Sequence, residues 1–309
     1  MPAPTAERVA ILTPDPGDDS RDDGWRSVLG RLAVALDRAG MTVVPTPWTA
    51  HVDDARSLLD YPIVLPLLAW GYHLRHADWL RACATWEAAG VRIANPPPVL
   101  ARNSDKRYLA TLERAGVAIP PTTWIDRVDQ ARVDAMFDAT GAERLIVKPT
   151  VSGGAWKTLR LRRGDRLDGA RDRLPGGAAM LQPYLPTIET EGETSLLFFG
   201  SRFSHAVNKR PVPGDFRIQS EYGGAYRAAT PPSEALALAR QVLDAIDAPL
   251  LYARIDLVPD ADGRWLLMEA ELIEPDLYLG QAPDAGAAFA AAVGAASAAA
   301  RLDHLPAIA

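Results

Sequence analysis

The chain has 309 residues, with 33 Lys and Arg against 39 Asp and Glu, a net charge of -6 and an isoelectric point near 5.4. This length allows two or three compact units, and the acidic balance argues against nucleic acid or an anionic membrane as a partner. The single cysteine, Cys83, cannot form a disulfide within the chain and is expected to be a small buried side chain. Because the sequence shows neither a secretory leader nor an apolar stretch of bilayer length, we expect a cytoplasmic protein with no membrane partner.

Short apolar runs surround a helical pattern in the first third of the chain. Residues 25–39 have the apolar spacing of a helix, and strands are predicted at residues 8–12, 41–44 and 62–66. This alternation predicts a small parallel α/β domain, which we place at residues 1–98.

An aromatic segment, Trp70-Gly71-Tyr72-His73, follows the third predicted strand. Ligands of parallel sheets gather beyond the carboxyl ends of the strands, so Trp70, Tyr72 and His73 could line a pocket for a small amino acid. Alternatively, the rings could simply pack one domain against another. The sequence leaves both interpretations open.

A lysine ends an apolar run in the middle of the chain. Lys148 is followed by Ser152-Gly153-Gly154, which combines an ammonium charge with flexible backbone amides and so suits polyphosphate oxygens. This segment is not a Walker loop, because the Gly-Lys-Ser/Thr ending is absent, and no Gly-x-Gly-x-x-Gly opens a helix after a strand.

Two further segments belong to the same unit, which we place at residues 99–188. Asn103 to Tyr108 is predicted to open a helix with capping residues, and it adds a second lysine, Lys106. The segment Gln182-Pro183-Tyr184-Leu185 follows an apolar run, as a hinge would.

The remaining part, residues 189–309, is predicted to contain mainly strands and two helices. One helix covers residues 233–246 with Ser233 as its N-cap, and an alanine-rich helix covers residues 284–301 with Asp284 as a candidate N-cap. His205 alternates with apolar residues as in a strand, which favours a structural role over that of a general base.

Carboxylates interrupt two apolar runs near the C-terminus. Strand periodicity places Glu269 and Glu271 on one face, and a neighbouring strand could bring Asp256 beside them. Clustered carboxylates in apolar surroundings cost folding free energy unless a cation neutralises them. This favours a bound Mg²⁺ ion whose coordination shell is completed by nucleotide phosphates. The alternative is a row of solvent-facing acids on a half-buried sheet.

These segments, taken in order, resemble the ATP-grasp superfamily of carboxylate-amine ligases, and within it the glutathione synthetase-like branch with the small ligases of antibiotic biosynthesis. The resemblance extends from about residue 91 to 279, and Arg254-Ile255-Asp256 with Met268-Glu269-Ala270-Glu271 is its most specific part. It implies an α/β ATP-grasp fold with an N-terminal parallel domain, a small ATP lid subdomain and a C-terminal mixed-sheet domain. A homodimer is a further implication.

The resemblance also implies a set of ATP contacts: two lysines on the phosphates, a glycine lid, a hinge around the adenine, and an acid near the ribose. In chain order these residues are Lys106, Lys148, Ser152, Gly153, Gly154, Gln182, Tyr184, Leu185, Glu193 and Lys209. The implied catalytic residues are Lys148 and Arg210, of which Arg210 is directed at an acyl phosphate.

Metal and substrate residues follow from the same resemblance. The implied metal ligands are Asp256, Glu269 and Glu271, and because Glu271 stands where the family usually has asparagine, the extra charge favours two Mg²⁺ ions over one. The candidates for substrate binding are Trp70, Tyr72, His73, Arg217 and Glu274. Arg217 could bind a carboxylate in bidentate fashion or could be a solvated loop residue.

The implied reaction is ATP-dependent formation of a C–N bond. A carboxylic acid attacks the γ-phosphate, giving ADP and an acyl phosphate, and an amine then displaces the phosphate. The expected substrates are a small amino-acid-like carboxylic acid and an amine, joined either within one molecule, as in ring closure of the cycloserine type, or between two molecules. Two alternatives stay open: a small-molecule kinase with the same ATP site, and a nucleotide-binding module without activity.

Overall fold

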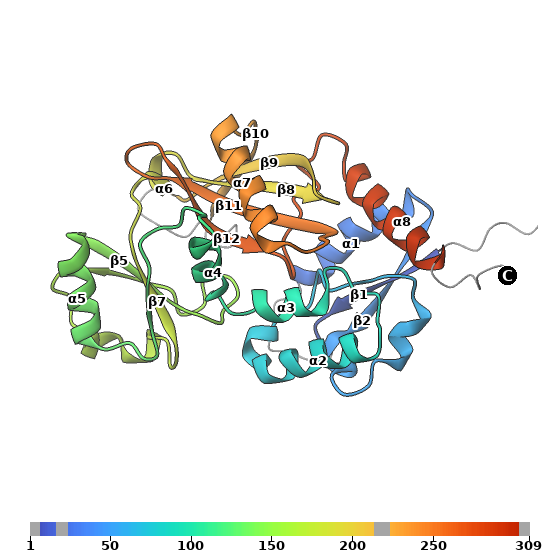
Figure 1. Cartoon of the computed structure of the whole chain (residues 1–309), viewed down its shortest axis with the longest axis horizontal. Coiled ribbons are helices and arrows are strands. Elements are labelled where there is room, and N and C mark those ends of the chain that lie inside the picture. Colours follow the sequence, from blue (N-terminus) through green and yellow to red (C-terminus); the bar gives the residue numbers. More distant parts are fainter. Residues whose placement is uncertain (1–6, 17–23, 213–222, 303–309) are drawn as a thin grey trace, which may run out of the picture.

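The computed structural model describes residues 7–16, 24–212 and 223–302, and within them three sheets lie side by side along the long axis of the molecule (Figure 1). The first sheet is parallel, has the order β2-β1-β3, and consists of β1 (Glu7–Thr13), β2 (Met41–Pro47) and β3 (Val64–Leu65). The predicted parallel sheet in the first third of the chain is therefore confirmed.

Helices cover both faces of this sheet because β1 is apolar on both sides. Val9 and Ile11 pack against α1 (Gly24–Asp37), whereas Ala10 and Leu12 pack in a separate cluster with α2 (His76–Ala88). A strand covered in this way shows a continuous apolar run instead of alternation. Cys83 lies in the core side of α2 with 2% of its surface exposed, as the sequence predicted.

The second sheet is antiparallel and has the order β4-β7-β5-β6. Its strands are β4 (Thr123–Ile125), β5 (Arg144–Pro149), β6 (Leu159–Arg162) and β7 (Ala179–Pro183). One face is covered by α5 (Gln130–Thr140), whose N-cap Asp129 accepts a hydrogen bond from the backbone N–H of Arg132. The other face turns toward the third sheet and carries Lys148 of β5 and Gln182 of β7.

The third sheet is antiparallel and has the order β10-β9-β8-β11-β12. Its strands are β8 (Glu193–Phe199), β9 (Arg202–Arg210), β10 (Ala225–Ala229), β11 (Tyr252–Pro259) and β12 (Trp265–Glu271). The helices α4 (Tyr108–Arg114) and α7 (Ser233–Ile246) pack in its main core cluster. The short helices α3 (Pro97–Asn103) and α6 (Thr187–Thr190) lie in the connections between units.

The alanine-rich helix α8 (Ala287–Leu302) connects the third sheet to the first. Phe289 and Val293 pack in one core cluster with Val9 of β1 and Phe199 of β8, and small alanine side chains allow this close approach. The side chain of Asp284 accepts hydrogen bonds from the backbone N–H groups of Gly286 and Ala288, but α8 begins at Ala287, so Asp284 lies before the N-cap position predicted for it.

Two other predicted helix caps are wrong. The helix α7 begins at Ser233, but its N-cap is Pro232, and the Ser233 hydroxyl bonds the carboxylate of Glu234 instead of the backbone. The helix expected to open at residues 103–108 begins only at Tyr108 and has no side-chain cap, because the preceding residues form a connection between α3 and α4.

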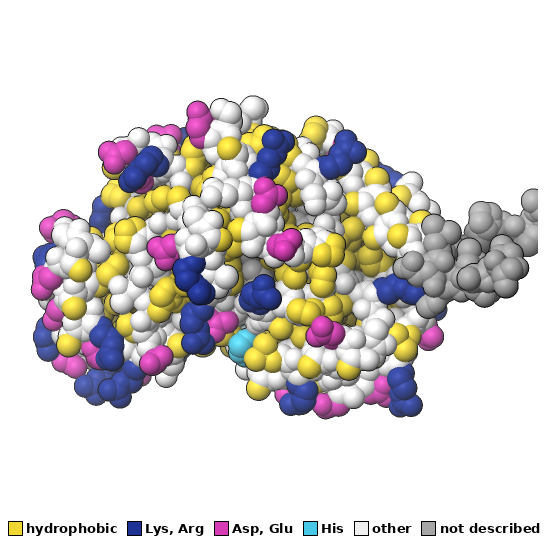
Figure 2. All heavy atoms as spheres, in the orientation of Figure 1, with side chains coloured by type: hydrophobic (Ala, Val, Ile, Leu, Met, Phe, Trp, Pro, Cys, Tyr) yellow, Lys and Arg dark blue, Asp and Glu magenta, His cyan; other side chains and the backbone are white. Residues whose placement is uncertain are grey.

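Among the described residues, no helix is both long enough and apolar enough to cross a lipid bilayer. Figure 2 shows charged and apolar side chains mixed over the visible face of the molecule. It also shows a hollow where the unit that carries α5 meets the N-terminal unit.

Candidate active site

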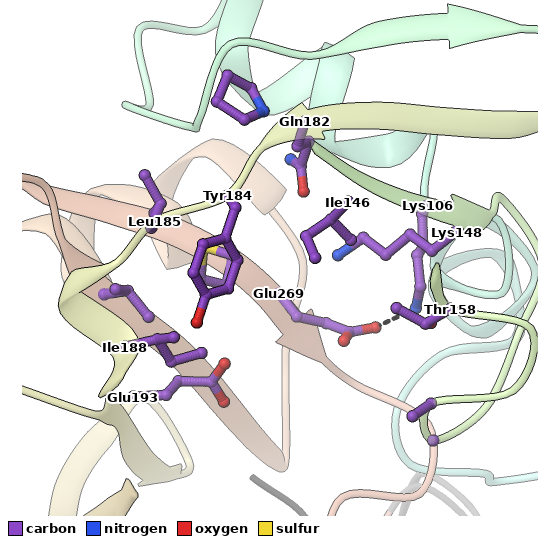
Figure 3. A pocket seen from close by; sticks show the side chains of 15 residues that line it. Lys106, Ile146, Lys148, Thr158, Gln182, Tyr184, Leu185, Ile188, Glu193 and Glu269 are labelled. Atoms are coloured by element: carbon purple, nitrogen blue, oxygen red, sulfur yellow. Dashed lines mark hydrogen bonds and ion pairs between the residues drawn. The ribbon is translucent and has the colours of Figure 1, made fainter. Parts of the chain in front are cut away.

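A cavity that is open to solvent lies between the second and third sheets (Figure 3). Its walls come from β5 and β7 on one side, from β8, β11 and β12 on the other, and from the glycine loop after β5. The lining residues are Lys106, Ile146, Lys148, Gly154, Ala155, Thr158, Gln182, Pro183, Tyr184, Leu185, Ile188, Glu193, Val258, Met268 and Glu269. The cavity thus has an apolar part and a charged part.

Strand alternation explains how β5 contributes to the cavity. Leu145 and Val147 point into the core under α5, and therefore Ile146 and Lys148 point to the opposite face, where they line the cavity. Figure 3 shows the Lys148 side chain extending across the cavity beside Ile146. Burial lowers the pKa of Lys148, while Glu269 opposes that shift.

The connection between α3 and α4 places the second lysine. The Asn103 side chain donates to the carbonyl oxygen of Ala270 and accepts from the backbone N–H of Leu272, as the backbone of a neighbouring strand would. The Tyr108 hydroxyl likewise donates to the carbonyl oxygen of Ala270 and accepts from its N–H. These bonds hold the connection on the edge of β12. Lys106, between the two anchors, therefore forms a partly buried ion pair with Glu269.

The ion pair between Lys106 and Glu269 sets the charge state of both groups. Burial opposes the charge on Lys106, but Glu269 and its acidic neighbours outweigh it and raise the pKa of Lys106. Burial likewise disfavours ionised Glu269, but Lys106 and Lys148 outweigh it and lower the pKa of this carboxyl. Both side chains are therefore charged at neutral pH.

The acidic residues come together as strand periodicity predicted. In the pairing of β11 with β12, Asp256 lies opposite Glu269, and Arg254 lies opposite Glu271. Ala270, between the two glutamates, points into the apolar core. The register also shifts after Asp256 and leaves Met268 without a partner, and this bulge lets Met268 and Glu269 both line the cavity although they are adjacent.

Each of these acids contacts a cation in the described structure. An Arg254 nitrogen lies 2.9 Å from an Asp256 oxygen, and the same guanidinium also pairs with Glu271. Lys209 lies 3.3 Å from Asp256 and 2.5 Å from Glu193. Burial disfavours ionised Asp256, but Arg254 and Lys209 outweigh it, and the pKa of Asp256 lies well below its usual range.

The carboxylates nevertheless outnumber the cations around them. Burial raises the pKa of Glu193 to about 7, of Glu271 to about 8 and of Glu274 to about 7, with neighbouring acids adding to the shift in each case. Among the described residues, no three His, Cys, Asp or Glu side chains converge as a ready metal centre. The donor set still fits Mg²⁺, because Asp256 and Glu269 offer hard oxygen ligands from paired strands.

The glycine loop meets the N-terminal unit. Gly154 lines the cavity and Ser152 is buried with 4% of its surface exposed, whereas Gly153 packs against His73. A Cβ atom on Gly153 would lie 2.9 Å from the Nδ1 of His73, whose ring centroid is 5.9 Å from that of Trp156. The aromatic segment after β3 therefore contacts the loop that the sequence associates with phosphates.

The other residues of the aromatic segment pack in cores. Tyr72 is buried with a ring centroid 5.1 Å from that of Trp79, which is the packing alternative left open by the sequence. Trp70 packs partly buried against the cluster between the first sheet and α8. The Nε2 of His205 donates to the carbonyl oxygen of Leu277 in a buried position, and the structural role of this histidine is confirmed.

Several predicted residues lie away from the cavity wall or outside the described part of the chain. Lys209 is buried beneath the wall and contacts Glu193 and Asp256, and Arg210 is exposed at the end of β9, where it donates to Asn208. Glu274 is half-buried near Lys106 and Glu269. Arg217 lies outside the described residues.

The sequence did not identify one member of the charged cluster or the apolar residues of the cavity wall. Arg254 stands two residues before Asp256, so the period of a strand could have identified it as a member of the charged cluster. Ile146, Ile188, Val258 and Met268 carry no such signal, because an apolar residue facing a cavity has the same pattern as one in the core.

Comparisons with known proteins agree with this geometry. Residues 9–95 match the family model described as the N-terminal domain of D-cycloserine synthetase DcsG. The chain is 33% identical to the cycloserine biosynthesis protein DcsG of Streptomyces lavendulae over 243 residues, which cover 72% of this chain and 79% of that protein.

Solved structures extend the likeness to nearly the whole chain. The crystal structure of D-cycloserine synthetase DcsG matches with a TM-score of 0.79 and 27% identity, covering 94% of this chain and 99% of that one. D-alanine–D-alanine ligase from Bacillus anthracis shares the fold, with a TM-score of 0.71, 15% identity and coverage of 97% and 100%. These matches assign the fold to the ATP-grasp class. The chain belongs to the DcsG family of carboxylate-amine ligases, and it is an ATP-dependent enzyme that forms C–N bonds and releases ADP.

Proposed function

We propose that the protein activates a small amino-acid-like carboxylic acid as an acyl phosphate and couples it to an amine, with MgATP bound in the cavity between the second and third sheets. The observation that carries this proposal is the division of the cavity: Lys106, Lys148 and Glu269 converge in one part, and Ile146, Leu185 and Met268 line another. A polyphosphate needs the charged part, and a flat base suits the apolar part.

The lysines and acids of the charged part would hold MgATP together. Two Mg²⁺ ions, the number that the family resemblance implies, would be held by Asp256 and Glu269 with Glu271 beside them, and would neutralise charge on the phosphates. Lys106 and Lys148 place two further positive charges where negative charge develops on the transferred phosphoryl group.

Water exclusion is the other contribution of the chain. The glycine loop, with Ser152, Gly153 and Gly154, lies between the lysines and the N-terminal unit, and its closure over the phosphates would protect the acyl phosphate from hydrolysis. Arg210 at the end of β9 would stabilise the oxyanion formed when the amine attacks. No covalent protein nucleophile is required.

The family supports the proposed substrate class. The matched relative takes its name from cycloserine biosynthesis, and the likeness covers most of both chains, which supports a role in antibiotic biosynthesis with a small amino-acid-like acid. His73 and Glu274, which lie near the glycine loop and near Lys106, are the described residues that we assign to this substrate. Ring closure within one molecule and ligation of two molecules both suit this chemistry.

The test uses the purified protein with ATP, Mg²⁺ and pools of amino acids and small hydroxy or ureido acids. Phosphate release that depends on one acid, with a product lighter by one water than the summed substrates in mass spectrometry, establishes the ligase and names its substrate. A phosphorylated product without free phosphate would instead indicate a kinase.

A further inference from the structure

One amide stands in the apolar part of the cavity. Gln182 on β7 has 2% of its surface exposed and lines the cavity together with Ile146, Leu185 and Met268. Figure 3 shows its amide oxygen directed toward the middle of the cavity. A polar group at the edge of an apolar slot recognises the polar edge of whatever ring enters the slot, so the orientation of this amide decides which rings are accepted.

The orientation of the amide is set by a neighbour outside the cavity wall. The Nε2 of Gln182 donates to the hydroxyl oxygen of Thr122 at 2.9 Å. The Thr122 hydroxyl itself donates to the carbonyl oxygen of Pro120 at 2.7 Å. Because a threonine hydroxyl has one hydrogen, and Pro120 receives it, the Thr122 oxygen can only accept from the amide.

The reversed amide is therefore disfavoured. A rotated Gln182 would place its carbonyl oxygen against the lone pairs of the Thr122 hydroxyl and would bury an unsatisfied acceptor. The next residue after Pro120 is also a proline, whose ring fixes φ and limits the freedom of the segment that offers the carbonyl. The cavity is thus presented with a hydrogen-bond acceptor and not with a donor.

We propose that Thr122 is a positioning residue that makes the cavity select adenine, by holding Gln182 as an acceptor for the 6-amino group. A purine with a carbonyl at the same position presents a second acceptor, which Gln182 cannot satisfy without rotating away from Thr122. This inference rests on the proposed binding of MgATP in the cavity, and it adds a residue that does not touch the nucleotide.

The test compares the dissociation constants of MgATP and MgITP by titration calorimetry, because inosine carries a carbonyl where adenosine carries the amino group. We expect the wild-type protein to bind MgATP at least about tenfold more tightly than MgITP. Thr122→Val keeps the shape of the side chain but removes the acceptor, so the ratio of the two constants should fall by about tenfold.

Matched variants separate positioning from a general loss of structure. Thr122→Ser keeps the hydroxyl and should keep the ratio, and so should Thr123→Val, whose hydroxyl contacts Met136 and not Gln182. Gln182→Met removes the amide and should lose the discrimination even if the valine variant does not fold.

Three results would overturn the inference. An unchanged ratio in folded Thr122→Val contradicts the role of Thr122, and an unchanged ratio in Gln182→Met contradicts the role of the amide. Equal binding of MgATP and MgITP by the wild-type protein removes the selectivity but leaves the proposed ligase standing. Binding of neither nucleotide would instead remove the proposed function itself.

Discussion

Lys148 and Glu269 lie at the charged part of the cavity, and their removal should stop the reaction without unfolding the protein. Lys148→Ala removes a positive charge from the proposed phosphate site, and Glu269→Ala removes a proposed metal ligand and frees Lys106 from its ion pair. We expect the rate of product formation to fall at least about 100-fold in each variant, because the loss of one preorganised electrostatic contact has an effect of this size in other enzymes.

Phosphate release and product mass measure that loss, and circular dichroism checks the fold. Arg163→Ala is a suitable control, because this arginine pairs with Asp138 on the surface of the second unit, away from the cavity. Normal turnover in folded Lys148→Ala or Glu269→Ala would contradict the assignment of the site.

Cys83 provides a test of burial that does not depend on the reaction. Burial raises the pKa of its thiol from 9.0 to about 12, so the native protein keeps the thiol neutral. We expect iodoacetamide to label Cys83 slowly in the native state at pH 8 and rapidly in denaturant, as followed by mass spectrometry. Equal labelling rates in the two states would show that the α2 core is open.

The same thiol gives a pH dependence of stability. Because the pKa is raised on folding, the contribution of Cys83 is complete below pH 9 and is lost as the pH rises toward 12. The free energy of unfolding should fall by up to about 1.4 kcal/mol per pH unit in this range from this group alone. Urea titrations of the wild-type protein and of Cys83→Ala should therefore diverge in slope above pH 9.

At the scale of elements, the contact between the glycine loop and the segment after β3 is sensitive to a small substitution. Gly153→Ala would place a methyl group 2.9 Å from the Nδ1 of His73 and should push the loop away from the N-terminal unit. We expect the KM for ATP to rise severalfold, since the displaced loop could no longer close over the phosphates as proposed.

Two further variants check that interpretation. Gly177→Ala adds a methyl group in open space near β7 and should leave KM unchanged. His73→Ala combined with Gly153→Ala should recover part of the loss, and a double-mutant cycle measures the coupling. Independent effects of the two substitutions would exclude the contact as the cause.

At the scale of the whole molecule, α8 joins the first sheet to the third. Phe289 is fully buried between them, so Phe289→Ala should lower the free energy of unfolding by about 3–5 kcal/mol in urea titrations. Val34→Ala, at a position with 54% of its surface exposed, should change it by less than about 0.5 kcal/mol. Equal effects would mean that α8 is not part of the cooperative fold.

Several expectations about the whole molecule stay predictions. These are the homodimer, the cytoplasmic location and the division of the chain at residues 98 and 188. The Arg217 assignment also stays a prediction, since that residue lies outside the described part of the chain.

The sequence by itself determined the features that depend on neighbours along the chain. The apolar run of β1, the bounds of α7, and the placement of Glu269 and Glu271 on one face all follow from the period of a strand or a helix. The order of lysines, glycine loop and acids also gave the family, because each short segment carries its own chemical signal.

Only the tertiary structure decided which of these residues meet. Lys106 reaches Glu269 because Asn103 and Tyr108 bind the edge of β12, and nothing in the sequence near Lys106 specifies that edge. The sequence likewise carries no signal for the bulge at Met268 or for the hydrogen bond between Thr122 and Gln182. Such contacts join residues far apart in the chain, so they depend on how whole units pack, whereas periodicity is fixed by backbone geometry within a few residues.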